Sequence, residues 1–325
     1  MGLSCFYDVG ERVAPSASGT PGAATTCSRD CRGGDCVAGV CKPATLATNQ
    51  AHPTGLAIDE SYVYWTNQAP LGAVMRARKT GAAQPEIVAA NQDSPFDIAV
   101  DDTNVYFTAT GGELPDAGQV LSAPKSGLRQ GEAPTVLAAK QTRPAGIAIH
   151  DDYVFWTAQG VVRSCHRLVP WTSGENVRDP GVLHAIAADV SYVYWSNTTE
   201  QRIMYKGRYE DDGSVGHLLA DTGSPPRGVT AAKGLLYWAE EGGRIMKWNT
   251  VSLQATVVTK DDAAWDVSAD GADVYWTKFT KNEVRSLSSP LPLAPNEDGP
   301  YDIASDSDAV YWTDYGAGTV KVLVK

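Results

Sequence analysis

The hydrophobic and polar positions of this chain follow a pattern that recurs seven times. Each copy has a short run of small and apolar residues, then a polar landmark, then a run of aromatic and β-branched residues. The first copy reads Gly55-Leu-Ala-Ile-Asp59 followed by Tyr64-Trp65-Thr66. The landmarks of the others are Asp101 and Phe107, His150 and Trp156, Asp189 and Trp195, Ala232 and Trp238, Asp270 and Trp276, and Asp306 and Trp312. Their separation is constant while the outer spacing varies, which indicates a rigid hairpin between loops of different length.

Each copy is long enough for four β-strands. In the first we expect strands at 55–59, 62–67, 73–78 and 86–90, because clusters of Gly, Pro, Asn and Asp separate these segments. A period of about 41 residues is typical of the blades of a β-propeller. The second strand is apolar on both faces, so the aromatic residues from Trp65 to Trp312 are expected in the core rather than at a ligand. The sequence predicts an all-β, seven-bladed β-propeller with four-stranded antiparallel blades.

The last copy ends at Lys325 after its third strand. Residues 43–53 resemble residues 134–144, which contain the fourth strand of the second copy. We therefore expect residues 43–50 to supply the outer strand of the seventh blade and to close the ring. The propeller would then span 43–325, behind a flexible tether at 1–26 and a disulfide-rich module at 27–42.

Three copies of the second strand carry related four-residue motifs. They are Tyr64-Trp65-Thr66-Asn67, Tyr194-Trp195-Ser196-Asn197 and Tyr311-Trp312-Thr313-Asp314. These resemble the YWTD repeats of the low-density-lipoprotein receptor family, which implies an extracellular propeller that binds proteins. That family has six blades against seven copies here, and the closing Asp survives only as Asp314. A second likeness, to the seven-bladed bacterial streptogramin lyases, rests on blade count and repeat length.

Charge and composition exclude some classes of function. There are 27 Lys and Arg against 38 Asp and Glu, a net charge of −11, and no basic stripe accompanies the aromatic residues. Binding to nucleic acid is therefore not expected. The acidic surface suits a cation or a basic partner, or it keeps an exported protein in solution. No transmembrane segment is expected, because no run of about 18 apolar residues occurs, and we expect a monomer.

Four of the six cysteines lie close together, at Cys27, Cys31, Cys36 and Cys41. The spacing and the turn residues between them indicate two disulfides within the module, with the connectivity undetermined. A four-thiolate zinc site is the alternative, but zinc ribbons prefer Cys-x2-Cys pairs, which are absent here.

Disulfides form in an oxidising compartment, so we expect an extracellular, periplasmic or cell-surface protein whose leader has been removed. Leu3-Ser4-Cys5 loosely resembles the end of a bacterial lipoprotein signal, with Cys5 as the lipidated residue. The cysteine-rich module also looks like those of bacterial surface proteins. Cys165 is expected to be buried or bonded to Cys5.

The loops that lead into the inner strands of a propeller meet at one mouth of the central channel. The residues before these strands are Thr54, Phe96, Ala145, His184, Arg227, Trp265 and Tyr301. The strand-start residues are Gly55, Asp97, Gly146, Ala185, Gly228, Asp266 and Asp302. Repeats under packing constraint alone would keep similar residues at equivalent positions. We therefore predict a ligand site formed by Phe96, His184, Arg227, Trp265 and Tyr301, with plugging of the channel as the alternative role for Trp265 and Tyr301.

The chemistry expected at this mouth follows from its side chains. Aromatic rings stack on a ligand, and Arg227 grips a carboxylate. Asp97, Asp266 and Asp302 are candidate ligands for calcium or another divalent cation, although an Asp at a strand start also accepts backbone hydrogen bonds. No organic cofactor is expected.

Catalysis has weaker support in the sequence. The five histidines lack zinc-ligand spacing, and no Gly-x-Ser-x-Gly motif occurs. If the chain is an enzyme, it is a metal-dependent lyase or hydrolase with His184 as the general base. The favoured function is a recognition module that binds a protein, peptide or carbohydrate.

Overall fold

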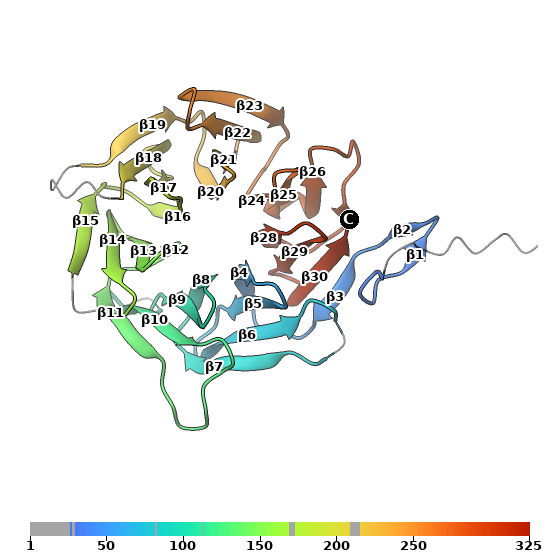
Figure 1. The fold of residues 1–325 in the computed structure, drawn as a ribbon, viewed down its shortest axis with the longest axis horizontal. Coiled ribbons are helices and arrows are strands. Elements are labelled where there is room, and N and C mark those ends of the chain that lie inside the picture. The colour runs from blue at the N-terminus through green and yellow to red at the C-terminus, as the bar shows by residue number, and fades with distance from the viewer. Residues whose placement is uncertain (1–26, 28–29, 82, 113, 169–172, 209–214) are drawn as a thin grey trace, which may run out of the picture.

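The protein is a ring of seven four-stranded antiparallel sheets (Figure 1). This computed structural model describes residues 27, 30–81, 83–112, 114–168, 173–208 and 215–325. Successive blades are joined by a link from the outer strand of one to the inner strand of the next. The predicted fold class, with seven blades of four strands, is confirmed.

The first four blades follow one another along the chain. Blade 1 contains β4 (Pro53–Ile58), β5 (Tyr62–Asn67), β6 (Gly72–Arg78) and β7 (Glu86–Gln92). Blade 2 contains β8 (Pro95–Val100), β9 (Asn104–Ala109), β10 (Gly118–Pro124) and β11 (Thr135–Gln141). Blade 3 contains β12 (Ile147–His150), β13 (Tyr153–Ala158), β14 (Val161–His166) and β15 (Ser173–Arg178). Blade 4 contains β16 (Leu183–Ala188), β17 (Tyr192–Asn197), β18 (Arg202–Gly207) and β19 (His217–Asp221).

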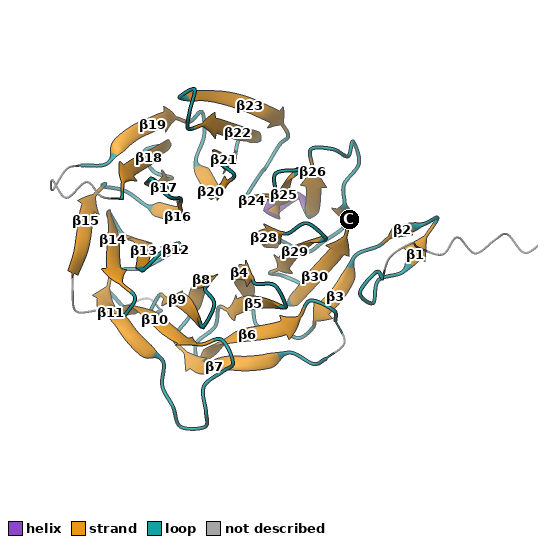
Figure 2. Ribbon diagram, in the orientation of Figure 1, coloured by secondary structure: helices purple, strands orange, loops and turns teal. Residues whose placement is uncertain are grey.

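The remaining three blades complete the ring. Blade 5 contains β20 (Pro226–Ala232), β21 (Leu235–Glu240), β22 (Arg244–Asn249) and β23 (Gln254–Lys260). Blade 6 contains β24 (Val267–Ala269), β25 (Val274–Lys278), β26 (Glu283–Ser286) and β27 (Ala294–Pro295). Blade 7 contains β28 (Pro300–Ser305), β29 (Ala309–Asp314), β30 (Thr319–Val324) and β3 (Ala44–Ala47). Figure 2 shows the strands in orange and the single-turn helix η1 (Phe279–Lys281), and no helix among the described residues is long and apolar enough to cross a membrane.

The ring is closed by strands from opposite ends of the chain. β3 lies beside β30 in Figure 1 and pairs with it antiparallel, with Ala44 opposite Val322. Leu46 and Ala47 are buried against Tyr311 of the same blade. The predicted closure by residues 43–50 is therefore confirmed, because β3 covers the edge that β30 would otherwise leave open.

The N-terminal segment beside blade 7 is held by two disulfides. They join Cys27 to Cys36 and Cys31 to Cys41, across the short hairpin of β1 (Cys36–Val37) and β2 (Val40–Cys41). The prediction of two disulfides within the module is confirmed. The expected tether at 1–26, with Cys5, lies outside the described residues. Cys165 is buried in β14, and this burial raises the pKa of its thiol to about 11.

The repeated tryptophans form the core between blades, as predicted. Trp65, Trp195 and Trp312 are fully buried. A buried indole N–H needs an acceptor. Five of the six Trp residues at this position find one at the end of the preceding blade, namely Gln50 for Trp65, Gln141 for Trp156, Asp179 for Trp195, Asp261 for Trp276 and Glu297 for Trp312. Each of these five tryptophans therefore joins its own blade to the one before it, whereas the indole of Trp238 donates to Glu240 of its own blade.

A hydroxyl residue after the aromatic landmark joins each blade to the one that follows. Its oxygen donates to the carbonyl of a residue near the start of the next inner strand, in the pairs Thr66–Phe96, Thr108–Ala145, Thr157–His184, Ser196–Arg227, Thr277–Tyr301 and Thr313–Thr54. Blade 5 has Ala239 at this position, and there the amide of Gly228 donates to the carbonyl of Trp265 over 2.9 Å. This bond fixes the backbone of each residue at the mouth.

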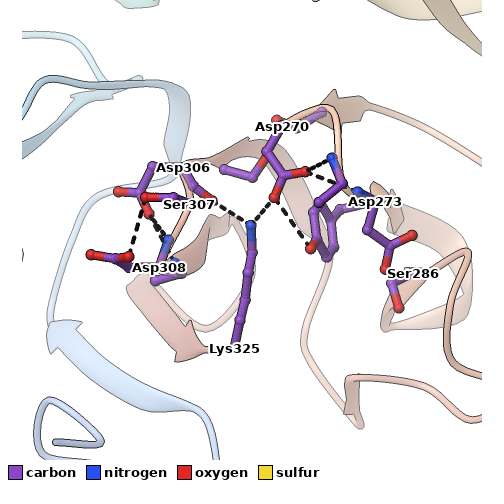
Figure 3. A network of polar contacts seen from close by, with 12 residues as sticks. Asp270, Asp273, Ser286, Asp306, Ser307, Asp308 and Lys325 are labelled. Carbon is purple, nitrogen blue, oxygen red and sulfur yellow. Dashed lines mark hydrogen bonds and ion pairs between the residues drawn. The ribbon is translucent and has the colours of Figure 1, made fainter. Parts of the chain in front are cut away.

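A third contact lies at the other end of the inner strands. A carboxylate there accepts hydrogen bonds from its own hairpin, as Asp59 does from the amides of Ser61 and Tyr62. The residue after the third strand of the next blade places a cation on it, as Lys125 does at 2.9 Å from Asp59. We call these two residues the latch carboxylate and the latch cation. Figure 3 shows the pair at blades 6 and 7, where Lys325 contacts Asp270.

Candidate functional site

The predicted mouth residues gather around one cavity. This cavity has a volume of about 340 Å³ and lies where the inner strands begin. Its lining includes four of the five predicted ligand-binding residues, Phe96, His184, Trp265 and Tyr301, and all three predicted carboxyls, Asp97, Asp266 and Asp302. Arg227, the fifth, lies over the ring of Trp265, with its guanidinium carbon 4.6 Å from the ring centroid.

The aromatic side chains form one continuous wall. The ring of Trp265 lies 5.6 Å from that of Tyr301 and 6.3 Å from that of His184, measured between centroids. Phe96 contacts both His184 and Tyr301 edge-on, at 6.0 and 6.3 Å. These spacings are within the range at which aromatic pairs attract one another. Residues from four blades therefore make a single apolar surface.

Three members of this wall were missed by the sequence analysis. Phe279 in η1 lies 5.0 Å from Trp265, Tyr315 lies 6.0 Å from Tyr301, and His52 stacks on Tyr315 at 4.6 Å. Phe279 and Tyr315 follow the second strands of blades 6 and 7. In an antiparallel sheet these loops lie at the same end as the loops into the inner strands. Phe279 and Tyr315 could therefore have been recognised in the sequence, because each is an aromatic residue two positions after a Trp-Thr pair.

Arg227 and His184 have defined charge states. Arg227 pairs with Glu241 and is also held over Trp265. His184 has its pKa lowered to about 4, first by burial and then by the positive charge of Arg227. The imidazole is therefore neutral at physiological pH. Its Nδ1 is buried and has no hydrogen-bond partner among the described residues, so it remains available to a ligand.

The three carboxyls at the base of the cavity bridge neighbouring inner strands. Asp97 accepts from the amide of Ile147 in blade 3, over 2.8 Å. Asp266 accepts from Ile303 in blade 7 over 3.1 Å. Asp302 accepts from Leu56 in blade 1 over 2.7 Å. A strand-start Asp was expected to accept backbone hydrogen bonds within its own loop. Each of these carboxyls has a second role, because it also joins two blades.

Burial makes these carboxyls hold protons more tightly than usual. It raises the pKa of Asp97 to about 7 and also raises the pKa of Asp266. The pKa of Asp302 is raised well above its usual range, by burial and then by the charge of Asp266, with which it shares a hydrogen bond. Two carboxyls in contact cannot both ionise easily, so we assign a shared proton to the Asp266 and Asp302 pair.

Packing explains part of the variation at the strand starts. A Cβ on Gly228 would lie 1.9 Å from the carboxyl oxygen of Asp266, and a Cβ on Gly55 would lie 2.6 Å from the Cα of Asp97. A larger side chain at Gly55 or Gly228 would therefore clash with the aspartate that begins the next inner strand. Packing accounts for the glycine at these two strand-start positions.

The geometry does not test the predicted cation. In the described part of the chain, the group of three metal-type ligands whose atoms lie within 4.8 Å of one another is Cys27, Cys31 and Cys41, and these are disulfide-bonded. The carboxyl oxygens of Asp97, Asp266 and Asp302 already accept backbone hydrogen bonds. Calcium or another divalent cation at this site stays a prediction.

A second cavity continues from the mouth across blades 1 to 4. Its volume is about 440 Å³, and it shares Phe96 and His184 with the central cavity. Its other polar lining comes from loops on the same face, at Gln68, Ser94, Thr110, Arg143 and Gln159. These residues were not predicted from the sequence, because they lie outside the two positions per blade that were compared near the start of the inner strands.

Comparison with known proteins supports the fold. No family model matches the chain, and no curated protein matches it. Among solved structures, a virginiamycin B lyase from Staphylococcus aureus has a TM-score of 0.69 at 15% identity, over 87% of this chain and 98% of that one. A chain of a nidogen/laminin complex has a TM-score of 0.56 at 19% identity, over 75% of this chain and 97% of that one. The WD40 propeller domain of Doa1 has a TM-score of 0.66 at 12% identity, over 87% and 97%. At these identities the likeness is one of fold alone.

Proposed function

We propose that this chain is an extracellular or cell-surface recognition module that binds a protein, peptide or carbohydrate at the propeller mouth. The observation that carries the proposal is the wall of aromatic rings around one cavity, beside the unpartnered Nδ1 of His184. Aromatic faces contact the apolar face of a sugar or a peptide side chain, while His184 and Arg227 orient its polar groups. Aromatic and Arg residues in such positions each contribute about 2 kcal/mol or more to binding.

The compartment is part of the same proposal. The disulfides Cys27–Cys36 and Cys31–Cys41 are compatible with an oxidising environment. Together with the YWTD-like motifs, they support a bacterial exported or surface protein of the YWTD-like type. Lipidation at Cys5 would tether it to a membrane. Palmitate labelling in a bacterial host, compared between the wild type and Cys5→Ser, tests that step.

The experiment for the mouth is a thermal-shift screen of sugars, peptides and divalent cations, followed by titration of any ligand found. Trp265→Ala and Arg227→Ala are each expected to weaken binding at least tenfold while the melting temperature changes little. Tyr153→Ala is a matched control, because Tyr153 is 40% exposed on blade 3 and does not line the mouth. If Trp265→Ala lowers stability by several kcal/mol and spares binding, the aromatic wall plugs the channel.

The alternative is a metal-dependent lyase or hydrolase. It is favoured by one observation, the free Nδ1 of His184 beside three carboxyls. A histidine with a pKa of about 4 is a weak general base at neutral pH, so we place recognition first. A thermal shift that depends on a divalent metal and is lost in His184→Ala would reverse this order. Ligand binding that is indifferent to His184→Ala would support recognition.

A further inference from the structure

The contact between latch cation and latch carboxylate is present at most blade interfaces. Four cations reach the latch carboxylate of the preceding blade, in the pairs Lys79–Asp306, Lys125–Asp59, Arg167–Asp101 and Lys325–Asp270. Between blades 3 and 4 the landmark is His150, and Arg208 pairs with the next residue, Asp151. Two of the four cations also lie over the tyrosine that bonds the same carboxylate, with Lys79 at 5.2 Å from the Tyr311 centroid and Lys325 at 4.5 Å from that of Tyr275. The pair in Figure 3 is therefore one instance of a repeated arrangement.

The two other interfaces depart from it in different ways. Between blades 5 and 6 neither position is charged, because the carboxylate is replaced by Ala232 and the cation by Ser289. Between blades 4 and 5 the carboxylate is kept as Asp189, but the position of the cation holds Thr250. In blade 1, Tyr62 lies opposite Arg78, the residue before Lys79. In blade 5, Leu235 lies opposite Asn249, the residue before Thr250, so Thr250 occupies the position of the latch cation. Asp189 is therefore the latch carboxylate whose cation is missing.

The contacts of Asp189 are those of its own hairpin. It accepts from the amides of Ser191 and Tyr192 over 2.8 Å and from the hydroxyl of Tyr194 over 3.0 Å. Arg208 contacts the main-chain oxygen of Asp189 and pairs with Asp151 in blade 3. Within the described ranges no cation lies on the Asp189 carboxylate. Thr250 does not reach it either, since its hydroxyl donates to the carbonyl of Gly234 over 2.8 Å.

A small crevice occupies the place of the missing side chain. Its volume is about 40 Å³, and its lining is Tyr192, Tyr194, Tyr205, Leu219, Trp248, Thr250 and Leu253. This volume suits one ammonium head group, since a water molecule takes about 30 Å³. Tyr194, whose hydroxyl bonds Asp189, forms part of the wall, and Tyr205 contacts Tyr192 edge-on at 5.4 Å. Leu253 in this lining is 66% exposed, so an apolar side chain lies at the opening of the crevice.

We propose that this crevice binds a lysine side chain of a partner protein, which supplies the cation that the blade 4 and blade 5 interface lacks. The ammonium group pairs with Asp189 and lies over the ring of Tyr194, as Lys325 lies over Tyr275. The methylene stem packs against Leu219, Trp248 and Leu253. The site lies at the end of β16 opposite to His184, so it is independent of the mouth.

The proposal is tested with Nα-acetyl-lysine methylamide as the probe and its norleucine analogue as the neutral control, by ligand-detected NMR titration. We expect the lysine probe to bind and the norleucine probe to bind at least tenfold more weakly. Thr250→Lys fills the site from within and is expected to abolish binding, as is Asp189→Asn. Thr250→Val, which adds no charge, should retain it.

Stability provides a second readout that needs no ligand. Thr250→Lys is expected to raise the melting temperature, because the new ammonium finds Asp189. Ser289→Lys is the matched control at the interface that carries Ala232, and it should not raise the melting temperature. The proposal is overturned if the wild type fails to bind the lysine probe, if the norleucine probe binds equally well, or if Thr250→Lys leaves binding unchanged.

Discussion

The hydroxyl contacts between blades are tested most directly by Thr313→Val. Thr313 is fully buried, accepts from the amide of Asp302 over 3.1 Å and donates to the carbonyl of Thr54 over 2.8 Å. The contact joins blade 7 to blade 1, across the interface where the ring closes. Valine has nearly the same shape but no hydroxyl, so the substitution removes both bonds and leaves a buried amide and a buried carbonyl without this partner.

The expected loss follows from these two groups. Each buried polar group left unpaired costs about 1 to 3 kcal/mol, and the added methyl group offsets roughly 1 kcal/mol. We expect Thr313→Val to lower the free energy of unfolding by about 1 to 5 kcal/mol. In large domains roughly 2 to 4 °C of melting temperature corresponds to each kcal/mol.

Urea unfolding followed by tryptophan fluorescence measures this change, because the buried Trp residues report on the blade interfaces. Thr45→Val is the matched control, since Thr45 is exposed on β3. We expect it to change the free energy of unfolding by less than about 0.5 kcal/mol. If the two variants unfold at the same urea concentration, the hydroxyl does not hold the blades together.

Two further predictions concern closure and pH. Removal of residues 1–50 takes away β3 and should lower the melting temperature or cause aggregation, whereas removal of 1–26 keeps β3 and both disulfides and should do neither; equal melting temperatures for the full chain and 51–325 would refute this. The raised pKa of Asp97, about 7, means that the folded protein holds a proton that the unfolded chain releases. The melting temperature should therefore fall as pH rises from 6.5 to 8, and Asp97→Asn should flatten the fall. The lowered pKa of His184 acts on stability in the opposite direction, mainly below this pH range. An unchanged slope would contradict the raised pKa of Asp97.

The architecture was predictable because its signals are local. The constant distance between Asp59 and Trp65, repeated in every copy, requires nothing beyond one hairpin. Closure was predictable because residues 43–53 resemble 134–144. The contacts between blades were not predictable, because they depend on how one blade packs against the next. Lys125 and Asp59 are far apart in the sequence, and only the register of neighbouring blades shows that they meet at 2.9 Å.

The structure also weakens one of the reasons to expect a ligand at the mouth. Seven strand-start positions differ among blades, and this difference was part of the reason to expect a ligand there. The close approach of Gly228 to Asp266, and of Gly55 to Asp97, shows that packing accounts for the glycines at these two positions. The aspartates bridge inner strands, so their presence is no longer evidence for a ligand.

The residues one position before these strand-start residues still support a ligand site at the mouth. Their carbonyls are fixed by the same repeated contact, from Thr66 to Phe96 and from Thr277 to Tyr301, so the backbone there is under one constraint in almost every blade. Their side chains are under no such common constraint, and they range from Thr54 to Trp265. A uniform backbone with variable side chains is the arrangement expected where the scaffold is conserved and the ligand selects the surface. The case for recognition therefore depends on the aromatic wall, and substitutions there are more decisive than substitutions of the carboxyls beneath it.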